Sequence, residues 1–255
     1  MSNVSRSVES GVLTVTMQRP EHRNALVVAA YRALAAAVEE AAADDSVRAV
    51  ILTGGGGHFT AGNDLKDFQS PPPGGESAAM DFLRCLAGFP KPLLAAVEGV
   101  AVGIGSTMLL HCDFVYAGAG ARFRMPFVPL GLCPEGASTL LLARAVGPRR
   151  AAEWLLLGRE FSATEAAEAG FVSAATEAGG ALARAQETAR ALAQLPAQAM
   201  RTTKALLLHA DRAAVLEAID REAIQFRTLR DSPDAQRAFA AFFARRDKPP
   251  AGRDR

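Results

Sequence analysis

Cysteine and histidine are scarce in this chain of 255 residues, and neither is spaced as disulfide or metal chemistry requires. The three cysteines are Cys85, Cys112 and Cys133, and the four histidines are His22, His58, His111 and His209. No C-x-x-C pair occurs, and no two histidines stand at the spacing of a metal site. The sequence therefore argues against a disulfide framework and against zinc, and we predict no metal.

An excess of charge of either sign is also absent. Lysine and arginine number 28 against 27 aspartates and glutamates, which leaves a formal net charge of +1, and aromatic residues make up only 6% of the chain. A nucleic-acid-binding surface needs a basic face, often with aromatic side chains on which bases stack. We therefore expect no nucleic-acid partner and no attraction to an anionic membrane.

Long uninterrupted apolar runs are missing as well. The longest apolar tract, Leu93 to Leu110, contains Glu98 and glycines at positions 99, 103 and 105. A membrane-spanning helix would not carry a central carboxylate and so many glycines, so we expect a buried strand, a turn and a buried helix instead. Residues 1–11 lack the apolar stretch of a signal peptide, which favours a cytoplasmic protein.

What the chain does contain is an alternation of short apolar segments with alanine-rich ones. The segments expected as strands are 12–17, 49–52, 93–97 and 114–117, and the first expected helix is 27–43. Strands that alternate with helices predict an α/β fold. From Pro148 onward the strand signals fade, and the expected helices are 149–157, 163–169, 181–195, 197–209, 213–229 and 234–245.

This change in composition divides the chain. We predict a core domain at residues 1–195 and a helical C-terminal region at residues 196–255, which would serve as a lid or as a contact between subunits. The run Pro71 to Gly75 cannot continue a helix or a central strand, so residues 69–76 should form an exposed, mobile loop. The polar end of the chain, 248–255, should be frayed.

Two glycine-rich segments bear on function. Neither fits a phosphate loop, a dinucleotide-binding loop or a nucleophile elbow, because the required lysine, third glycine and flanking pattern are missing. Both segments, Phe59 to Lys66 and Gly99 to Thr107, read instead as a strand, a glycine turn and the start of a helix. Either one alone could be an ordinary tight turn. Together they could aim two unpaired N–H groups at one oxyanion.

Four segments in order carry a family resemblance: Arg19–Leu26, Phe59–Lys66, Gly99–Asp113 and Phe161–Ala166. With them the chain resembles the crotonase (enoyl-CoA hydratase/isomerase) family. The resemblance implies a crotonase-like α/β fold of repeated β-β-α units with a helical C-terminal region, assembled as a homotrimer or a dimer of trimers. It also implies an acyl-CoA thioester substrate and no separate cofactor, because coenzyme A is part of the substrate.

The resemblance assigns roles to individual residues. The backbone N–H groups of Asn63 and Ile104 would form the oxyanion hole. The residues expected to contact the substrate are Arg23, Ala25, Ala61, Gly62, Asn63, Asp64, Leu65, Gly103, Thr107 and Phe127. A hydratase of this family uses two glutamates, and Thr107 and Phe127 stand at their positions here, which disfavours hydration.

One carboxylate remains, Glu135, in the segment Leu130 to Ser138. From the residues alone it could be a helix N-terminal acid, since a helix is expected from there to Val146. The segment resembles that of peroxisomal-type Δ3,Δ2-enoyl-CoA isomerases, in which the glutamate at this position is the single catalytic base. This similarity implies an isomerase that moves the double bond of a 3-enoyl-CoA to the 2-enoyl position through a dienolate.

Other reactions stay open at this point. The alternatives are a hydratase with one carboxylate, a ring-opening or epoxide-type acyl-CoA isomerase, an acyl-CoA hydrolase or dehalogenase, and a non-catalytic acyl-CoA-binding protein. The chain ends in Arg253-Asp254-Arg255 and not in Ser-Lys-Leu, so the peroxisomal location of the similar isomerases does not carry over, and we expect a cytoplasmic one.

Overall fold

A computed structural model describes residues 3–64 and 77–246 of the chain. Its strands are β1 (Val4–Glu9), β2 (Val12–Met17), β3 (Ala49–Gly54), β4 (Leu93–Val97), β5 (Val100–Val102), β6 (Phe114–Gly118), β7 (Arg122–Arg124), β8 (Glu160–Ser162) and β9 (Ala174–Thr176). Its α-helices are α1 (Val28–Ala43), α3 (Ala78–Gly88), α4 (Ile104–Thr107), α5 (Ser138–Val146), α6 (Pro148–Leu157), α7 (Ala163–Glu168), α8 (Ala181–Ala193), α9 (Ala197–His209), α10 (Arg212–Arg230) and α11 (Pro233–Arg246). Short 3-10 helices are η1 (Pro20–His22), η2 (Met108–His111) and η3 (Val128–Leu130).

The main sheet has six strands in the order β1-β2-β3-β4-β6-β9. Strand β1 runs antiparallel to β2, and each later neighbour pairs in parallel. Strands β3 and β4 are buried almost along their whole length, as their continuous apolar sequences predict. The predicted α/β fold is confirmed.

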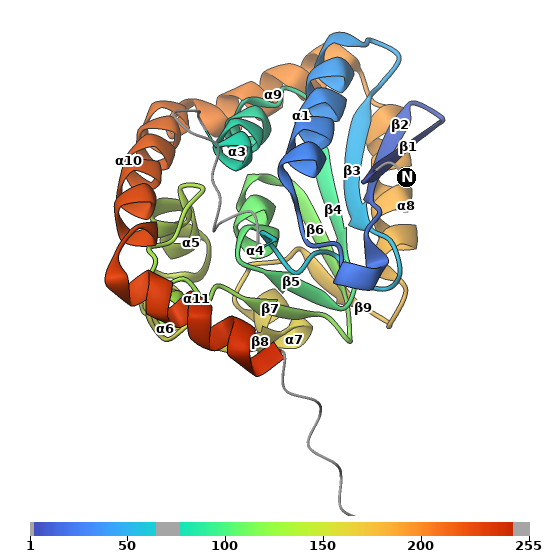
Figure 1. Cartoon of the computed structure of the whole chain (residues 1–255). Helices are drawn as coiled ribbons and strands as arrows, with labels where there is room; N and C mark the ends of the chain where they lie inside the picture. The colour runs from blue at the N-terminus through green and yellow to red at the C-terminus, as the bar shows by residue number, and fades with distance from the viewer. Residues whose placement is uncertain (1–2, 65–76, 247–255) are drawn as a thin grey trace, which may run out of the picture.

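A second, three-stranded sheet, β5-β7-β8, lies at one end of the main sheet (Figure 1). The chain reaches it twice directly from the main sheet, from β4 to β5 and from β6 to β7. A helix follows each time, α4 in the first case and α5, after η3, in the second. This is the expected β-β-α repeat, and it places the start of α4 where the two sheets meet.

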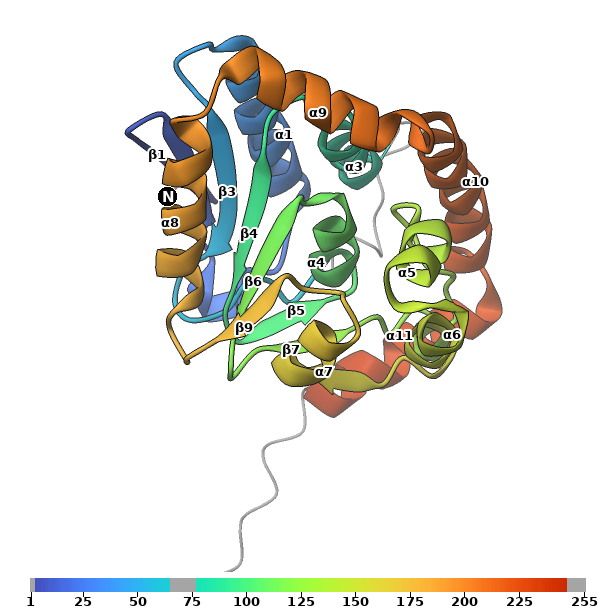
Figure 2. The same ribbon diagram turned by 180° about the vertical axis from the view of Figure 1, so that it is seen from behind.

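Helix α8 covers one face of the main sheet, and α1 lies on the opposite side (Figure 2). The buried residues of α8 are alanines at every fourth position, from Ala181 to Ala193. They form a separate apolar cluster with residues of the sheet such as Ile51 and Leu94. Small side chains at this spacing form one stripe along the helix, which lets it approach the sheet closely.

Helix α9 crosses the top of the molecule beside α1 and α3, and α10 and α11 continue down the side opposite β1, where α10 packs on α3 and α5 (Figure 1). Lys204 is the buried residue that fastens α9, because its Nζ donates to Asp113 Oδ2 and to the Lys91 carbonyl, both at 2.7 Å. Helix α11 packs so closely on the end of η3 that a Cβ at Gly131 would lie 2.8 Å from the Ala235 nitrogen. The division of the chain at residues 195 and 196 stays a prediction.

Several local expectations were wrong. Glu135 does not begin a helix, since α5 starts at Ser138 after two residues with positive φ, Gly136 and Ala137. The tract from Leu93 holds two strands and two short helices instead of one strand and one helix. Strands β8 and β9 interrupt the region expected to be helical, and β1 and α3 were not predicted. The expected loop at residues 69–76 and the frayed end at 248–255 lie outside the described residues.

Candidate active site

The turn at residues 19–26 is built around the buried side chain of Asn24. The Asn24 amide donates to the carbonyls of Gly55 at 2.8 Å and His58 at 2.7 Å, while its oxygen accepts from the Arg19 N–H at 2.8 Å. Arg23 and Asn24 both have positive φ, so this side-chain network fixes a backbone that would otherwise be unfavourable. The result is a rigid turn with its backbone groups turned toward residues 61–64.

Main-chain bonds tie that turn to the first glycine segment. The Ala61 N–H donates to the Arg23 carbonyl at 2.8 Å, and the N–H of Leu26 donates to the Gly62 carbonyl at 2.8 Å. On its other side the segment pairs with β5, because Thr60 and Val102 are joined by a 3.0 Å backbone bond. Gly62 has a φ of +85°, and a Cβ there would lie 2.5 Å from the Val102 carbonyl oxygen. Only glycine fits this approach of the two glycine segments.

The two N–H groups predicted to form the oxyanion hole belong to residues that come directly after Gly62 and Gly103 in the sequence. Asn63 succeeds Gly62, and Ile104 is the first residue of α4. Neither N–H donates a hydrogen bond to an acceptor in the part of the chain that the structure describes. Beside Ile104, the space where Gly103 would carry a Cβ is open, with no heavy atom within 4 Å. Both N–H groups are therefore free to donate to a ligand oxygen.

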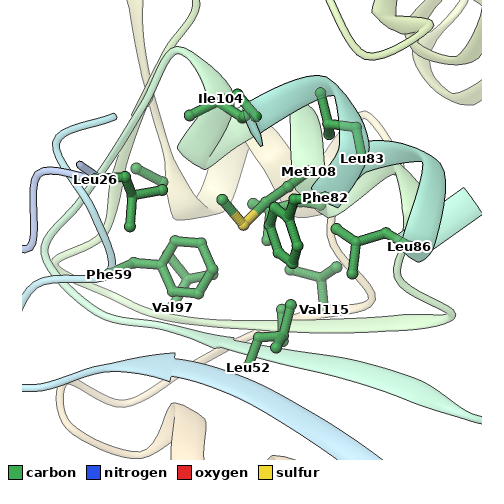
Figure 3. Close-up of a cluster of buried hydrophobic side chains, with 14 of the residues drawn as sticks. Leu26, Leu52, Phe59, Phe82, Leu83, Leu86, Val97, Ile104, Met108 and Val115 are labelled. Carbon is green, nitrogen blue, oxygen red and sulfur yellow. The ribbon is translucent and has the colours of Figure 1, made fainter. Parts of the chain in front are cut away.

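The side chains around the predicted oxyanion hole are anchored away from it. The side chain of Ile104 is buried in the core among Leu26, Phe59 and Met108 (Figure 3). The hydroxyl of Tyr31 on α1 donates to the side-chain oxygen of Asn63. Anchoring of this kind keeps backbone donors in place before a ligand arrives.

The remaining residues of the predicted substrate-binding set lie in two groups. Asp64 forms an ion pair with Arg19 at 3.2 Å, and the same guanidinium donates to the Ala25 carbonyl at 2.6 Å, so both brace the turn. Phe127 is buried and packs edge-on against Phe226 of α10, with ring centroids 6.4 Å apart. Leu65 lies outside the described residues.

Glu135 lies in the loop between η3 and α5, and its carboxyl group is buried, with the residue 1% exposed. The Thr107 hydroxyl donates to Glu135 Oε1 at 2.6 Å, and Oε2 has no partner among the described residues. Burial raises the pKa of Glu135 to about 8; the Thr107 bond opposes this rise, and the negative charge of Glu222 adds to it. Glu135 is therefore a carboxyl group able to accept and return a proton near neutral pH.

Helix α4 connects this carboxyl group to the predicted oxyanion hole. Ile104 begins the helix and Thr107 ends it, so the N–H and the hydroxyl that holds Glu135 are separated by about 4.5 Å along the axis. Thr107, which the resemblance predicts to stand where a family hydratase has its first glutamate, here donates to the side chain of Glu135.

Two residues near Glu135 were not assigned a part in the site from the sequence. His111 is half-buried, and desolvation of its ring lowers its pKa to about 4; its Nε2 lies 2.9 Å from the Gly136 carbonyl oxygen. Glu222 on α10 is buried and accepts a bond from the Thr139 N–H at 3.0 Å. A sequence signal for Glu222 exists, because it falls on the apolar stripe of α10 with Val215 and Phe226.

Within residues 3–64 and 77–246 no group of three or more histidine, cysteine, aspartate or glutamate side chains could hold a metal ion. In the same residues no helix combines the length and the apolar character needed to cross a membrane.

The fold and these two loops define a family. The chain belongs to the enoyl-CoA hydratase/isomerase family, the crotonases, whose family model matches residues 7–251. It is 34% identical to the human enoyl-CoA delta isomerase 2 over 94% of this chain, but it spans only 63% of that protein's length. It is also 34% identical to the 1,2-epoxyphenylacetyl-CoA isomerase of Escherichia coli, over 96% of this chain and 97% of that protein.

Solved structures with this fold carry the same family name. The crystal structure of an enoyl-CoA hydratase/isomerase from Pseudoalteromonas atlantica is 40% identical, with a TM-score of 0.92 over 98% of this chain and 100% of that one. Relatives named as hydratases also occur. The chain is therefore a crotonase-family enzyme of the enoyl-CoA hydratase/isomerase type.

Proposed function

We propose that this enzyme is an enoyl-CoA isomerase that converts a 3-enoyl-CoA into the conjugated 2-enoyl-CoA. The observation that carries the proposal is Glu135, a buried carboxyl group with one oxygen free, held by Thr107 at the end of the helix that begins with Ile104. Helix α4 thus connects one proton carrier, Glu135, with one candidate anion-binding group, the N–H of Ile104. Isomerisation through a dienolate needs no more than this.

In the proposed reaction the thioester oxygen lies between the N–H groups of Asn63 and Ile104. Glu135 takes a proton from C2, and the electron pair spreads over the dienolate, with negative charge on the thioester oxygen. The same carboxyl group then returns the proton to C4, so the C3–C4 double bond becomes a C2–C3 double bond. No proton, electron or water molecule is gained or lost.

Burial gives Glu135 a basicity suited to this task. A carboxylate with an ordinary pKa would be a weak base toward a carbon acid, whereas the raised pKa of Glu135 brings proton transfer closer to balance. The apolar surroundings also keep water from the dienolate. Thr107 and Phe127 stand where family hydratases carry glutamates, and neither side chain is a carboxylate that could activate water. This counts against hydration.

A second candidate reaction is the epoxide-type isomerisation of an aryl acyl-CoA. It is favoured by the relative from Escherichia coli named 1,2-epoxyphenylacetyl-CoA isomerase, which matches this chain along almost its whole length. A single carboxyl group beside an oxyanion hole could also serve a ring rearrangement. The substrate tests below separate the two.

The test of the proposal is turnover of a 3-enoyl-CoA by the purified protein and by Glu135→Gln. We expect conjugated product from the parent and a loss of rate of roughly a hundredfold to ten-thousandfold in the variant. Glu160→Gln is the matched control, because Glu160 is an exposed carboxylate whose nearest cation, Arg122, lies 3.8 Å away. A parent that binds acyl-CoA, leaves 3-enoyl-CoA unchanged and opens an arene epoxide would transfer the proposal to the second reaction.

Assembly and location belong to the same proposal. We propose a homotrimer or a dimer of trimers in the cytoplasm. Leu206 and Leu207 on α9 are 70% and 76% exposed, an apolar surface that a second copy would cover. The mass in solution, measured by light scattering, should be that of a trimer or hexamer for the parent and should fall when both leucines are replaced by lysine.

A further inference from the structure

Glu222 places a second buried carboxylate beside the loop that carries Glu135, and it does so from the C-terminal helical region. Its side chain on α10 is buried, with the residue 6% exposed. Its Oε1 accepts from the N–H of Thr139 at 3.0 Å and from the Thr139 hydroxyl at 2.5 Å. Thr139 belongs to the first turn of α5, directly after the loop. Helix α10, which is remote in sequence, is thus hydrogen-bonded to α5, the helix that follows the predicted base Glu135.

The loop needs such support. Gly136 has a φ of +73°, and Ala137, which has a Cβ, has a φ of +57°. A residue other than glycine stays in the left-handed region only where its surroundings hold it there. Three side chains from three elements do so here: Thr107 holds Glu135, His111 contacts the Gly136 carbonyl, and Glu222 holds Thr139.

The two carboxyl groups also act on each other through their charges. Each has an Oε2 that is buried without a partner among the described residues. Burial raises the pKa of Glu222, while the bonds from Thr139 favour its ionised form. Of its neighbours on α10, Asp220 pairs with Arg84 at 2.8 Å and Arg221 with Glu217 at 3.1 Å, all partly or largely exposed.

The other titratable groups at the loop are neutral near pH 7. Burial keeps His111 uncharged by lowering its pKa to about 4, and it raises the pKa of the Cys133 thiol to about 11. In the described part of the chain, Glu222 is the titratable group whose negative charge raises the pKa of Glu135. Its effect on Glu135 is electrostatic repulsion in a poorly solvated region, where charges are weakly screened.

We infer that Glu222 is a positioning residue: through Thr139 it holds the loop that presents Glu135. Its carboxyl group also lies close enough to act electrostatically on that base. The inference rests on the proposed role of Glu135. If Glu222 has this role, Glu135 is correctly placed only when α10 is packed against α5. The C-terminal helices then support the reaction without contacting the substrate.

The direct test needs no turnover. Protein labelled with carbon-13 at glutamate carboxyl groups is titrated by NMR, and the Glu135 signal is identified by its loss in Glu135→Gln. In Glu222→Gln, which keeps an oxygen for Thr139 but removes the charge, the midpoint of Glu135 should fall by roughly half to one pH unit. Glu217→Gln, on the exposed side of the same helix, should leave it unchanged. An identical midpoint in Glu222→Gln and the parent would overturn the inference.

Kinetics test the positioning part. Glu222→Ala and Thr139→Val should each lower kcat by about tenfold with little change in KM, because the base is misplaced while the CoA contacts remain. If Glu222→Ala does not fold, Thr139→Val gives the answer alone, and an unchanged kcat in Thr139→Val contradicts the positioning role. A parent that fails to isomerise 3-enoyl-CoA while its Glu135 midpoint shifts in Glu222→Gln refutes the proposed function and leaves this inference standing.

Discussion

Thr107 and Glu135, which are 28 positions apart in the sequence, are joined by a 2.6 Å hydrogen bond in the buried centre of the molecule. The family resemblance predicts a carboxylate at the position of Thr107 in a hydratase, and the Thr107 hydroxyl serves here as the donor to a carboxylate on another loop. In the proposed function this pair leaves the site with one proton carrier, Glu135, and no carboxylate at Thr107 to activate water.

The rate should depend on pH through Glu135. The base form must be present to take the C2 proton, and burial places the pKa of Glu135 at about 8. We expect kcat/KM for a 3-enoyl-CoA to rise with pH up to a midpoint near that value in the free enzyme. A rate that is constant from pH 6 to pH 9, about two units below and one above the midpoint, would contradict a base with this pKa.

Replacing Thr107 by valine should move that profile. The hydroxyl favours the ionised carboxyl group, so its loss should raise the pKa of Glu135 further and shift the rise of kcat/KM upward by about one pH unit. At neutral pH the variant would then be slower by about tenfold. Thr107→Ser retains a hydroxyl and should stay close to the parent. A shift toward lower pH in Thr107→Val would mean that the hydrogen bond does not favour the base form.

Glu135 should also make the fold less stable at high pH. Its folded-state pKa is about 8 against an ordinary value of 4.5, so the folded protein holds a proton that the unfolded chain has lost between these values. Stability linked to this group is present below the lower value and is lost as pH rises through the higher one. Glu135→Gln should match the parent at about pH 5 and be more stable by about 2–4 kcal/mol at about pH 8.5. Urea unfolding at both pH values measures this, and equal stability throughout would contradict it.

Gly62 and Gly179 offer a matched pair for the predicted oxyanion hole. Both have positive φ, +85° and +81°, but a Cβ at Gly62 would meet the Val102 carbonyl at 2.5 Å, whereas a Cβ at Gly179 would have no neighbour within 4 Å. Both alanine variants should lose about 1 kcal/mol of stability through backbone strain. Gly62→Ala alone should also lower kcat, by about a hundredfold, because it pushes the two loops apart. Equal activity in the two variants would argue against the oxyanion role of Asn63.

Much of the fold could be predicted from the sequence because its central elements have strong local signals. Strands β3 and β4 are continuous apolar runs buried on both faces, and α9 begins and ends where its sequence predicts. Strand β1 gave no such signal, since it is an edge strand whose residues after Val4 are exposed. Strand β9 has three residues, none of them buried, and is formed by its pairing with β6.

The candidate site also has a part that local sequence indicates and a part that depends on tertiary packing. Asn63, Ile104 and Glu135 lie in segments with a family resemblance, which gave each a role that stays a prediction. Two hydrogen bonds of the site, from Thr107 to Glu135 and from Thr139 to Glu222, depend on tertiary packing between distant elements. Only the place of Glu222 on the apolar stripe of α10 hinted at burial, and no local pattern indicates what a buried carboxylate contacts.

The central claim is that Glu135 moves a proton from C2 to C4 of a bound 3-enoyl-CoA. The most direct measurement is the reaction in D2O followed by NMR. The spectra report the position of the double bond and whether C4 gains deuterium from the solvent. For the parent we predict a conjugated 2-enoyl-CoA whose C4 gains little deuterium, because Glu135 returns there the proton that it took from C2, and for Glu135→Gln no conjugated product while acyl-CoA binding persists. Conjugated product formed by Glu135→Gln as fast as by the parent, or water addition to a 2-enoyl-CoA as the parent's only reaction, would contradict the account.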